Sequence, residues 1–112
     1  MITQDSFVVL TQLTYEPQLK EKVMHLIYNS MPLLKRQEGL IYIGVHHHLS
    51  EPKTMTYFAW ESEEYHLKCI KSEEFASIAQ EWNAMVQSGK AKFEMNIYSV
   101  IDSYSRHAES IF

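Results

Sequence analysis

The chain of 112 residues is long enough for one domain with a modest hydrophobic core. Its net charge of -4 comes without a basic patch, which excludes the electrostatic signature of a nucleic-acid-binding protein. Apolar runs are too short to span a bilayer, and the first residues show no signal peptide. Cys69 is the single cysteine, so an intrachain disulfide is excluded. We therefore expect a cytoplasmic protein without nucleic-acid or membrane partners.

The first half of the chain predicts a strand, a helix and a β-hairpin. Residues 7–14, FVVLTQLT, have the β-branched and apolar composition of a strand. A helix is expected to follow Pro17, with Val23, Leu26 and Leu34 among its buried positions. Pro32 is expected to kink or end this helix, and Gly39 closes the segment. Two strands, at 40–49 and 54–61, are then joined by a turn at 50–53.

The second half predicts two helices and a last strand. The phrases SEEY (62–65) and SEEF (72–75) each place a serine at a helix N-cap and two glutamates in the first turn. They predict a short helix at 63–71 and a longer one at 73–88, before a strand at 91–101. The order β-α-β-β-α-β indicates an α+β ferredoxin-like fold with an antiparallel four-stranded sheet covered on one face by helices. Residues 1–101 are taken as a single domain and 102–112 as a C-terminal tail.

The sheet face away from the helices is predicted to carry aromatic and histidine side chains. Tyr42, His46 and His48 alternate onto this face, and we expect Phe58 and Trp60 to share it. A bare apolar face of this kind is unusual for a soluble monomer. The simplest remedy is a homodimer in which two copies pack sheet against sheet.

Three consecutive histidines end the second predicted strand, and they allow several interpretations. His46 and His48 are expected at a strand end or at the dimer seam. A metal site would need further ligands, and no Asp, Glu, Cys or His stands at the spacing of a known metal-binding motif, so no metal is expected. His47 shares the face of the apolar residues that should meet the helices. Because imidazole titrates near neutrality, His47 is a candidate catalytic base.

Two further segments carry a family pattern: QEGLIYIGV at 37–45 and YFAWESEEYHLKCIKSEEF at 57–75, with a turn proline at Pro52 between them. The pattern is a strand ending in tryptophan, an acidic short helix, and a serine-then-phenylalanine start to the next helix. Over roughly residues 7–101 the chain resembles the antibiotic biosynthesis monooxygenase family. The matching residues are Trp60, Glu61, Ser62, Glu63, Ser72 and Phe75.

The resemblance implies a dimeric α+β barrel with a pocket between helices and sheet. Enzymes of this family oxidise small electron-rich aromatics with O₂ and without a bound metal or flavin. The chain is therefore expected to be a cofactor-independent monooxygenase acting on a small quinol or polyketide-like aromatic. The alternative is a non-catalytic dimeric domain that uses the same pocket to bind a small molecule.

Departures from the family pattern keep this alternative open. Cys69 stands where many members carry a histidine, and Phe58 stands where many carry a glutamate. Gln12 and Ile78 occupy the places of the asparagine and histidine of a haem-degrading branch, which disfavours haem degradation.

Four residues beside His47 are candidates for the implied pocket. His66, one turn before Cys69, is a second candidate base, and Cys69 itself is expected to line the pocket. Phe75 and Trp82 are expected to form its walls. Trp60 is interpreted as a packing residue.

Overall fold

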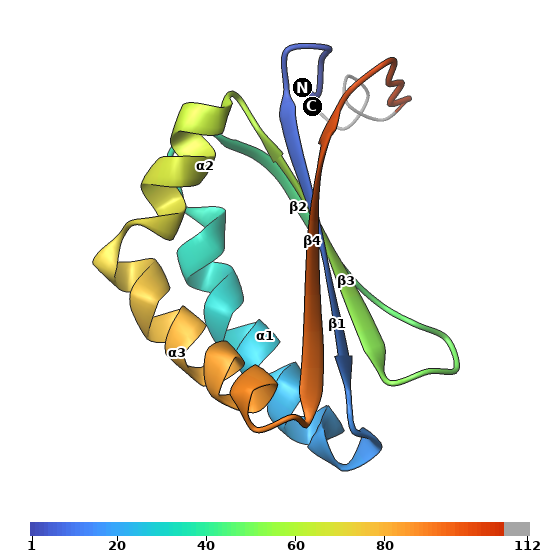
Figure 1. Cartoon of the computed structure of the whole chain (residues 1–112). Helices are drawn as coiled ribbons and strands as arrows, with labels where there is room; N and C mark the ends of the chain where they lie inside the picture. Colours follow the sequence, from blue (N-terminus) through green and yellow to red (C-terminus); the bar gives the residue numbers. More distant parts are fainter. Residues whose placement is uncertain (107–112) are drawn as a thin grey trace.

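The computed structural model describes residues 1–106 as one antiparallel sheet with helices on a single face (Figure 1). The four strands lie in the order β2-β3-β1-β4. The predicted α+β ferredoxin-like fold is confirmed. Its elements in chain order are β1 (Phe7–Tyr15), the 3-10 turn η1 (Pro17–Leu19), α1 (Lys20–Lys35), β2 (Leu40–His47), β3 (Lys53–Trp60), α2 (Glu63–Ile70), α3 (Glu73–Gln87) and β4 (Ala91–Ser99).

Both ends of the described chain lie at the same end of the sheet (Figure 1). The Gln4 side chain donates a hydrogen bond to the carbonyl of Ile101, and the Ser103 hydroxyl donates one to the carbonyl of Ile2. These bonds join the segment before β1 to the segment after β4. Residues 107–112 of the predicted tail lie outside the described residues. Among residues 1–106, no helix is long and apolar enough to cross a membrane.

The helix ends follow the local sequence in part. The Ser72 hydroxyl accepts a hydrogen bond of 3.1 Å from the Phe75 N–H, which confirms the predicted N-cap of α3. Ser62 has an extended N-cap backbone, but its side chain makes no capping hydrogen bond.

The predicted kink or end of the first helix at Pro32 is not an end: α1 passes through Pro32 and ends at Lys35. Proline removes one helical hydrogen bond, to the carbonyl of Tyr28, and Tyr28 lies at the surface where water can replace the lost donor.

The strand register corrects one prediction about the two faces of the sheet. Phe58 pairs with Val9 and Ile43, and Trp60 pairs with Phe7. Since paired residues of neighbouring strands share a face, Phe58 and Trp60 lie under the helices. Their predicted place on the opposite face is wrong. A register irregularity at the start of β2 and the length of the β2–β3 connection set this pairing, and neither is fixed by side-chain alternation alone.

The open face of the sheet still carries aromatic side chains. Tyr42 is 46% exposed there, and its ring meets that of Tyr57 edge-on with 5.8 Å between centroids. The Tyr42 ring lies over Gly44, where a Cβ atom would come within 2.7 Å of the tyrosine hydroxyl. Tyr98, which is 51% exposed, comes from β4 on the same face. Dimerisation through this face remains a prediction.

The hydrophobic core consists of two clusters at opposite ends of the sheet. One joins β1 and the start of β4 to α1 and the end of α3 through Leu13, Tyr15, Val23, Leu26, Met85 and Ala91. The other joins β1 and β3 to the end of α1 and to α2 through Val9, Leu34, Trp60 and Cys69. The helices are therefore held against the sheet mainly at its two ends.

Gly39 is expected to be far less tolerant of substitution than Gly89. Both have a positive φ, +81° and +79°. A residue with a Cβ atom loses roughly 1–2 kcal/mol of stability in this backbone conformation. A Cβ at Gly39 would also collide with the Tyr65 ring, whereas nothing lies near Gly89. Urea unfolding should show that Gly39→Ala lowers the free energy of unfolding by about 1–3 kcal/mol more than Gly89→Ala. Equal losses would contradict the close packing of Tyr65 on Gly39.

Candidate functional site

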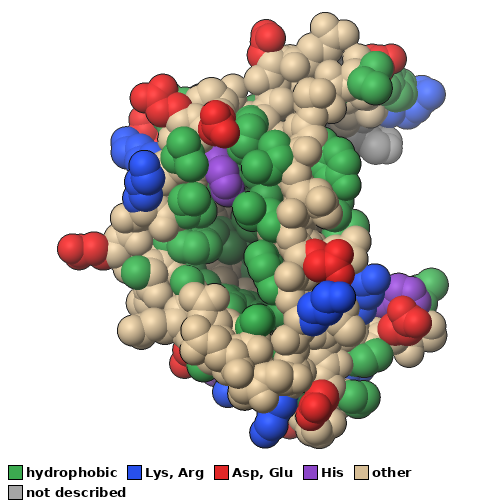
Figure 2. Space-filling view, viewed as in Figure 1, with side chains coloured by type: hydrophobic (Ala, Val, Ile, Leu, Met, Phe, Trp, Pro, Cys, Tyr) green, Lys and Arg blue, Asp and Glu red, His purple; other side chains and the backbone are tan. Residues whose placement is uncertain are grey.

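A cavity of about 400 Å³ lies between the helices and the sheet. Figure 2 shows its mouth as a hollow lined by hydrophobic side chains, between the helices and β4. Its volume falls within the range of small-molecule sites. The strands supply its floor, namely Val9, Thr11, Leu13, Val45, Thr54, Thr56, Phe58, Trp60, Phe93 and Met95. The helices supply its roof, namely Ile27, Ser30, Met31, Leu34, His66, Cys69, Ile70, Phe75, Ile78, Ala79, Trp82, Asn83 and Val86.

Short side chains in the middle of the two layers account for the hollow. Thr11 and Thr56 are paired directly across β1 and β3, and both line the floor. Ala79 is the smallest residue that α3 contributes to the roof. Larger side chains on either side, in the two core clusters, keep the layers apart. The cavity therefore results from the order of short and large side chains along these strands and helices.

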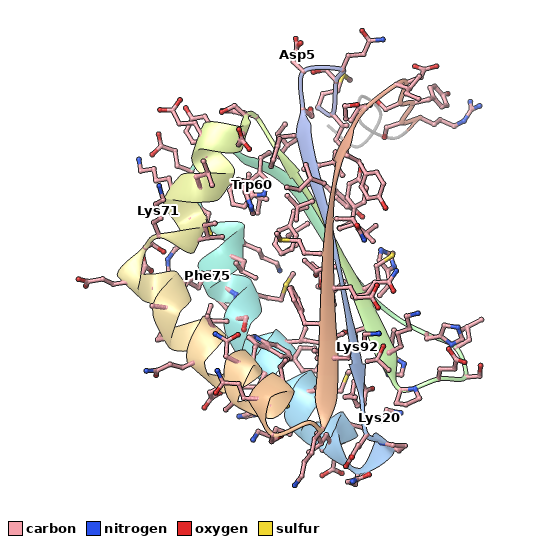
Figure 3. All side chains as sticks on the ribbon, in the orientation of Figure 1. Asp5, Lys20, Trp60, Lys71, Phe75 and Lys92 are labelled. Carbon is pink, nitrogen blue, oxygen red and sulfur yellow. The ribbon has the colours of Figure 1, made fainter. Side chains whose placement is uncertain are left out.

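A polar corner at the α2 end of the cavity contains an unpartnered donor. Trp60 is 2% exposed, and its indole Nε1 has no hydrogen-bond partner. The ring lies between α2 and the sheet (Figure 3). Phe58 packs beside it in a nearly parallel orientation, with 6.3 Å between the ring centroids. A buried N–H that lacks a partner costs on the order of 1–3 kcal/mol. The nitrogen lies behind the surface of the cavity, so this cost belongs to the packing of the core.

The two titratable groups of this corner are held in their uncharged forms. The His66 ring lies 5.9 Å from that of Trp60 and 5.5 Å from that of Phe7. Burial lowers the pKa of His66, and Glu63 acts in the opposite direction. Burial also raises the pKa of the Cys69 thiol, with a further contribution from Glu74. The corner therefore offers a neutral imidazole and a protonated thiol to the cavity.

The structure brings four of the five predicted site residues together. His66, Cys69, Phe75 and Trp82 all line the cavity. Phe75 comes from the first turn of α3, next to the capping serine (Figure 3). The roles proposed for these residues from the sequence stay predictions.

His47 lies apart from this group. It shares the helix-side face of the sheet, opposite Thr54, but it is exposed at the end of β2 and outside the cavity lining. Its Nε2 lies 2.6 Å from the hydroxyl of Tyr15, a residue that is 3% exposed. Burial raises the pKa of Tyr15, so the hydroxyl is protonated and can donate to the imidazole. The imidazole of His47 is therefore already engaged within the chain.

The neighbouring histidines have local partners or face away. His48 Nδ1 accepts hydrogen bonds from the backbone N–H groups of Ser50 and Glu51, at 3.1 and 3.0 Å, and so stabilises the turn. His46 lies exposed on the open face, opposite Met55. Within residues 1–106, no three His, Cys, Asp or Glu side chains converge in a way that could hold a metal ion.

Sequence reasoning missed Trp60 as a residue of the cavity lining. The family pattern includes this tryptophan, but the expected strand register placed its side chain on the wrong face of the sheet. Its position at the end of a strand, just before a short helix that carries a histidine, is the signal that could have identified it.

No family model matches the sequence, and no curated protein does. Solved structures do match. SnoaB, a cofactor-independent oxygenase from Streptomyces nogalater, aligns with a TM-score of 0.74 and 9% identity over 88% of this chain and 96% of its own. Rv0793 from Mycobacterium tuberculosis aligns with a TM-score of 0.74 and 10% identity, over 89% and 99% of the two chains. A conserved protein from Methanosarcina mazei Go1 aligns with a TM-score of 0.73 and 22% identity, over 86% and 93%.

The chain has the antibiotic biosynthesis monooxygenase fold. The resemblance predicted from the sequence is thus confirmed at the level of fold. Identities of 9–22% carry no conclusion about substrate or activity, which must be argued from the site itself.

Acidification is expected to destabilise the protein through His66. Because its pKa is lower in the folded state, the unfolded chain binds more protons once the pH falls below the ordinary value of about 6.5. Stability should therefore decline from that pH down to the pKa of the folded state. Urea midpoints measured at pH 7.5 and 5.5 should fall less in His66→Asn than in the wild type.

His25→Asn is the matched control, because His25 is exposed on α1. This variant should keep the acid sensitivity of the wild type. An unchanged pH dependence in His66→Asn would contradict the neutral, buried state of His66.

Proposed function

We propose that the cavity binds a small, uncharged aromatic molecule, and that the protein is a cofactor-independent monooxygenase of a quinol or a polyketide-like aromatic. One observation carries the proposal: an apolar cavity of about 400 Å³ is lined by the neutral imidazole of His66. SnoaB, which has the same fold, is a cofactor-independent oxygenase and supports the choice of reaction class.

Such chemistry needs a base, a donor for the developing negative charge and walls that exclude water. His66 is the proposed base, since a neutral imidazole can accept the proton of a substrate hydroxyl. Once protonated, the same imidazole would donate a hydrogen bond to the resulting oxyanion. The sequence favoured His47 over His66 as the base. We reverse this preference, because His66 lines the cavity and His47 does not.

The reaction balances for a quinol that has a free ring carbon. The quinol anion reduces O₂, and a carbon–oxygen bond forms at that carbon to give a hydroperoxide. The O–O bond then breaks, one oxygen atom stays on the ring and the other leaves as water. The products are a hydroxyquinone and water, and the substrate supplies all four electrons.

The alternative, a non-catalytic small-molecule-binding domain, also has an observation in its favour. Within the described residues the His66 ring makes no hydrogen bond to another side chain or backbone group. A catalytic base is usually oriented by such a partner. Binding without turnover would need only the cavity.

His66→Asn is expected to lower kcat/KM for quinol oxidation by about 100-fold or more, because it removes the proposed base. Oxygen uptake in metal-chelated buffer is the measurement. Trp82→Phe changes a wall of the same cavity, and its effect should fall mainly on KM.

The same assay separates the two candidate functions. Saturable quinol binding without oxygen uptake would establish the binding domain and exclude the monooxygenase. Equal losses of kcat in His66→Asn and Trp82→Phe would contradict a specific role for His66.

We further propose that the protein is a homodimer that packs through the open face of the sheet. Sedimentation at micromolar concentration should show a dimer. Tyr42→Asp should weaken it, because a carboxylate would be buried in an aromatic seam. Tyr28→Asp is the matched control, since Tyr28 is 74% exposed on α1, in the helix layer. A monomeric wild-type protein would exclude the proposal.

A further inference from the structure

We infer that Met95 is an oxidation site at the mouth of the cavity: a peroxide converts its thioether to the sulfoxide, and the added oxygen weakens the entry of apolar molecules. The inference does not depend on the monooxygenase reaction, because it concerns the opening of the cavity and not the chemistry inside. Three observations support it: the exposure of Met95, its place beside the opening, and the protected state of Cys69.

The six methionines of the chain differ widely in exposure. Met95 is 50% exposed and Met1 is 76% exposed, whereas Met85 is 4% exposed. The other three methionines are half-buried. Because a peroxide must reach the sulfur atom to oxidise it, Met1 and Met95 should react before the rest.

Met95 differs from Met1 in that it also lines the cavity. It lies on the edge strand β4, paired with Thr11 on the floor of the cavity. Its neighbours on the same face, Phe93 and Ile97, are half exposed as well. Figure 2 shows the hollow opening between the helices and β4. A molecule that enters from this side therefore passes along the Met95 side chain.

The single cysteine is poorly suited to the same reaction. Thiols react with peroxides as thiolates. Cys69 is 3% exposed, and burial raises the pKa of its thiol. A thioether has no proton to lose, so its oxidation needs no ionisation. Met95, and not Cys69, is therefore the sulfur atom of the cavity that responds to peroxide.

The oxidation balances with hydrogen peroxide as the only co-reactant. The sulfur atom attacks one peroxide oxygen, an S–O bond forms and the O–O bond breaks. The proton on the transferred oxygen passes to the departing hydroxide, which leaves as water. The sulfur atom loses the two electrons that the peroxide gains.

The sulfoxide changes the opening without disturbing the core. It is polar and accepts hydrogen bonds, whereas the thioether is apolar. An apolar molecule at the opening would remove water from the sulfoxide oxygen without replacing its hydrogen bonds, which is unfavourable. Because Met95 is half exposed, the oxygen can remain in water when the cavity is empty. The effect should therefore fall on binding and not on the stability of the fold.

Treatment of the full-length protein with hydrogen peroxide at pH 7.5, followed by peptide mass mapping, tests the site. Met95 should be oxidised about fivefold faster than Met85 or more, and Cys69 should remain reduced. The uncharged fluorescent probe N-phenyl-1-naphthylamine then reports binding. Oxidation should lower its affinity roughly three- to tenfold and leave the urea midpoint unchanged.

Three variants assign the effect to one sulfur atom. Met95→Leu keeps the wall apolar, so peroxide should leave its affinity for the probe unchanged. Met95→Gln places a polar group of similar length at the opening and should lower the affinity without peroxide. Met55→Leu is the matched control, because Met55 lies on the open face of the sheet, paired with His46 and Gln12. This variant should stay as sensitive to peroxide as the wild type.

Oxidation of Met85 or Cys69 before Met95 would overturn the inference. Complete oxidation of Met95 with no change in probe affinity would also overturn it, as would a wild-type protein that does not bind the probe. A loss of affinity in peroxide-treated Met95→Leu equal to that of the wild type would assign the effect elsewhere and have the same consequence.

Discussion

The separation between the helix layer and the sheet is the constraint on which the site depends. Two hydrophobic clusters hold the layers together at the ends of the strands. Between them, threonines on the floor and Ala79 on the roof are too short to meet. A void of this size would normally cost stability, because its lining loses dispersion contacts. A protein that keeps such a void and lines it with apolar side chains has a space that a ligand can fill.

Trp60 links the stability of the fold to the position of His66. Its ring is a central part of one core cluster, packed parallel to Phe58 with 9° between the ring planes. The His66 ring lies 5.9 Å from that of Trp60, so the same packing limits how the imidazole can turn at the edge of the cavity. The indole N–H itself is buried behind the cavity surface and belongs to the core.

The sequence predicted the elements and their order well, because these depend on local patterns. The strand at Phe7–Tyr15, the split second helix and the Ser72 cap all follow from short-range signals. The strand register did not follow, since it depends on how β2 begins and on the connection between His47 and Lys53. The error moved Phe58 and Trp60 to the wrong face of the sheet, and it hid Trp60 as a residue of the cavity lining.

His47 shows a second limit of reasoning from the sequence. Alternation placed it correctly on the helix side, but it could not say how far along the strand the cavity extends. That depends on where α2 and α3 settle over the sheet, which is a property of long-range packing. His66 was ranked lower because its direction on a short helix could not be deduced, yet it is His66 that faces the cavity.

The two histidine–aromatic pairs on the helix side differ in what they leave available. Tyr15 and His47 satisfy each other with a hydrogen bond of 2.6 Å, so their polar atoms contribute to structure. Trp60 and His66 lie close without a hydrogen bond between them, and His66 lines the cavity. An imidazole that is already hydrogen-bonded within the chain has less to offer a ligand than one that has no such bond. This difference, more than the number of histidines, favours His66 over His47 as the residue that a ligand in the cavity would meet.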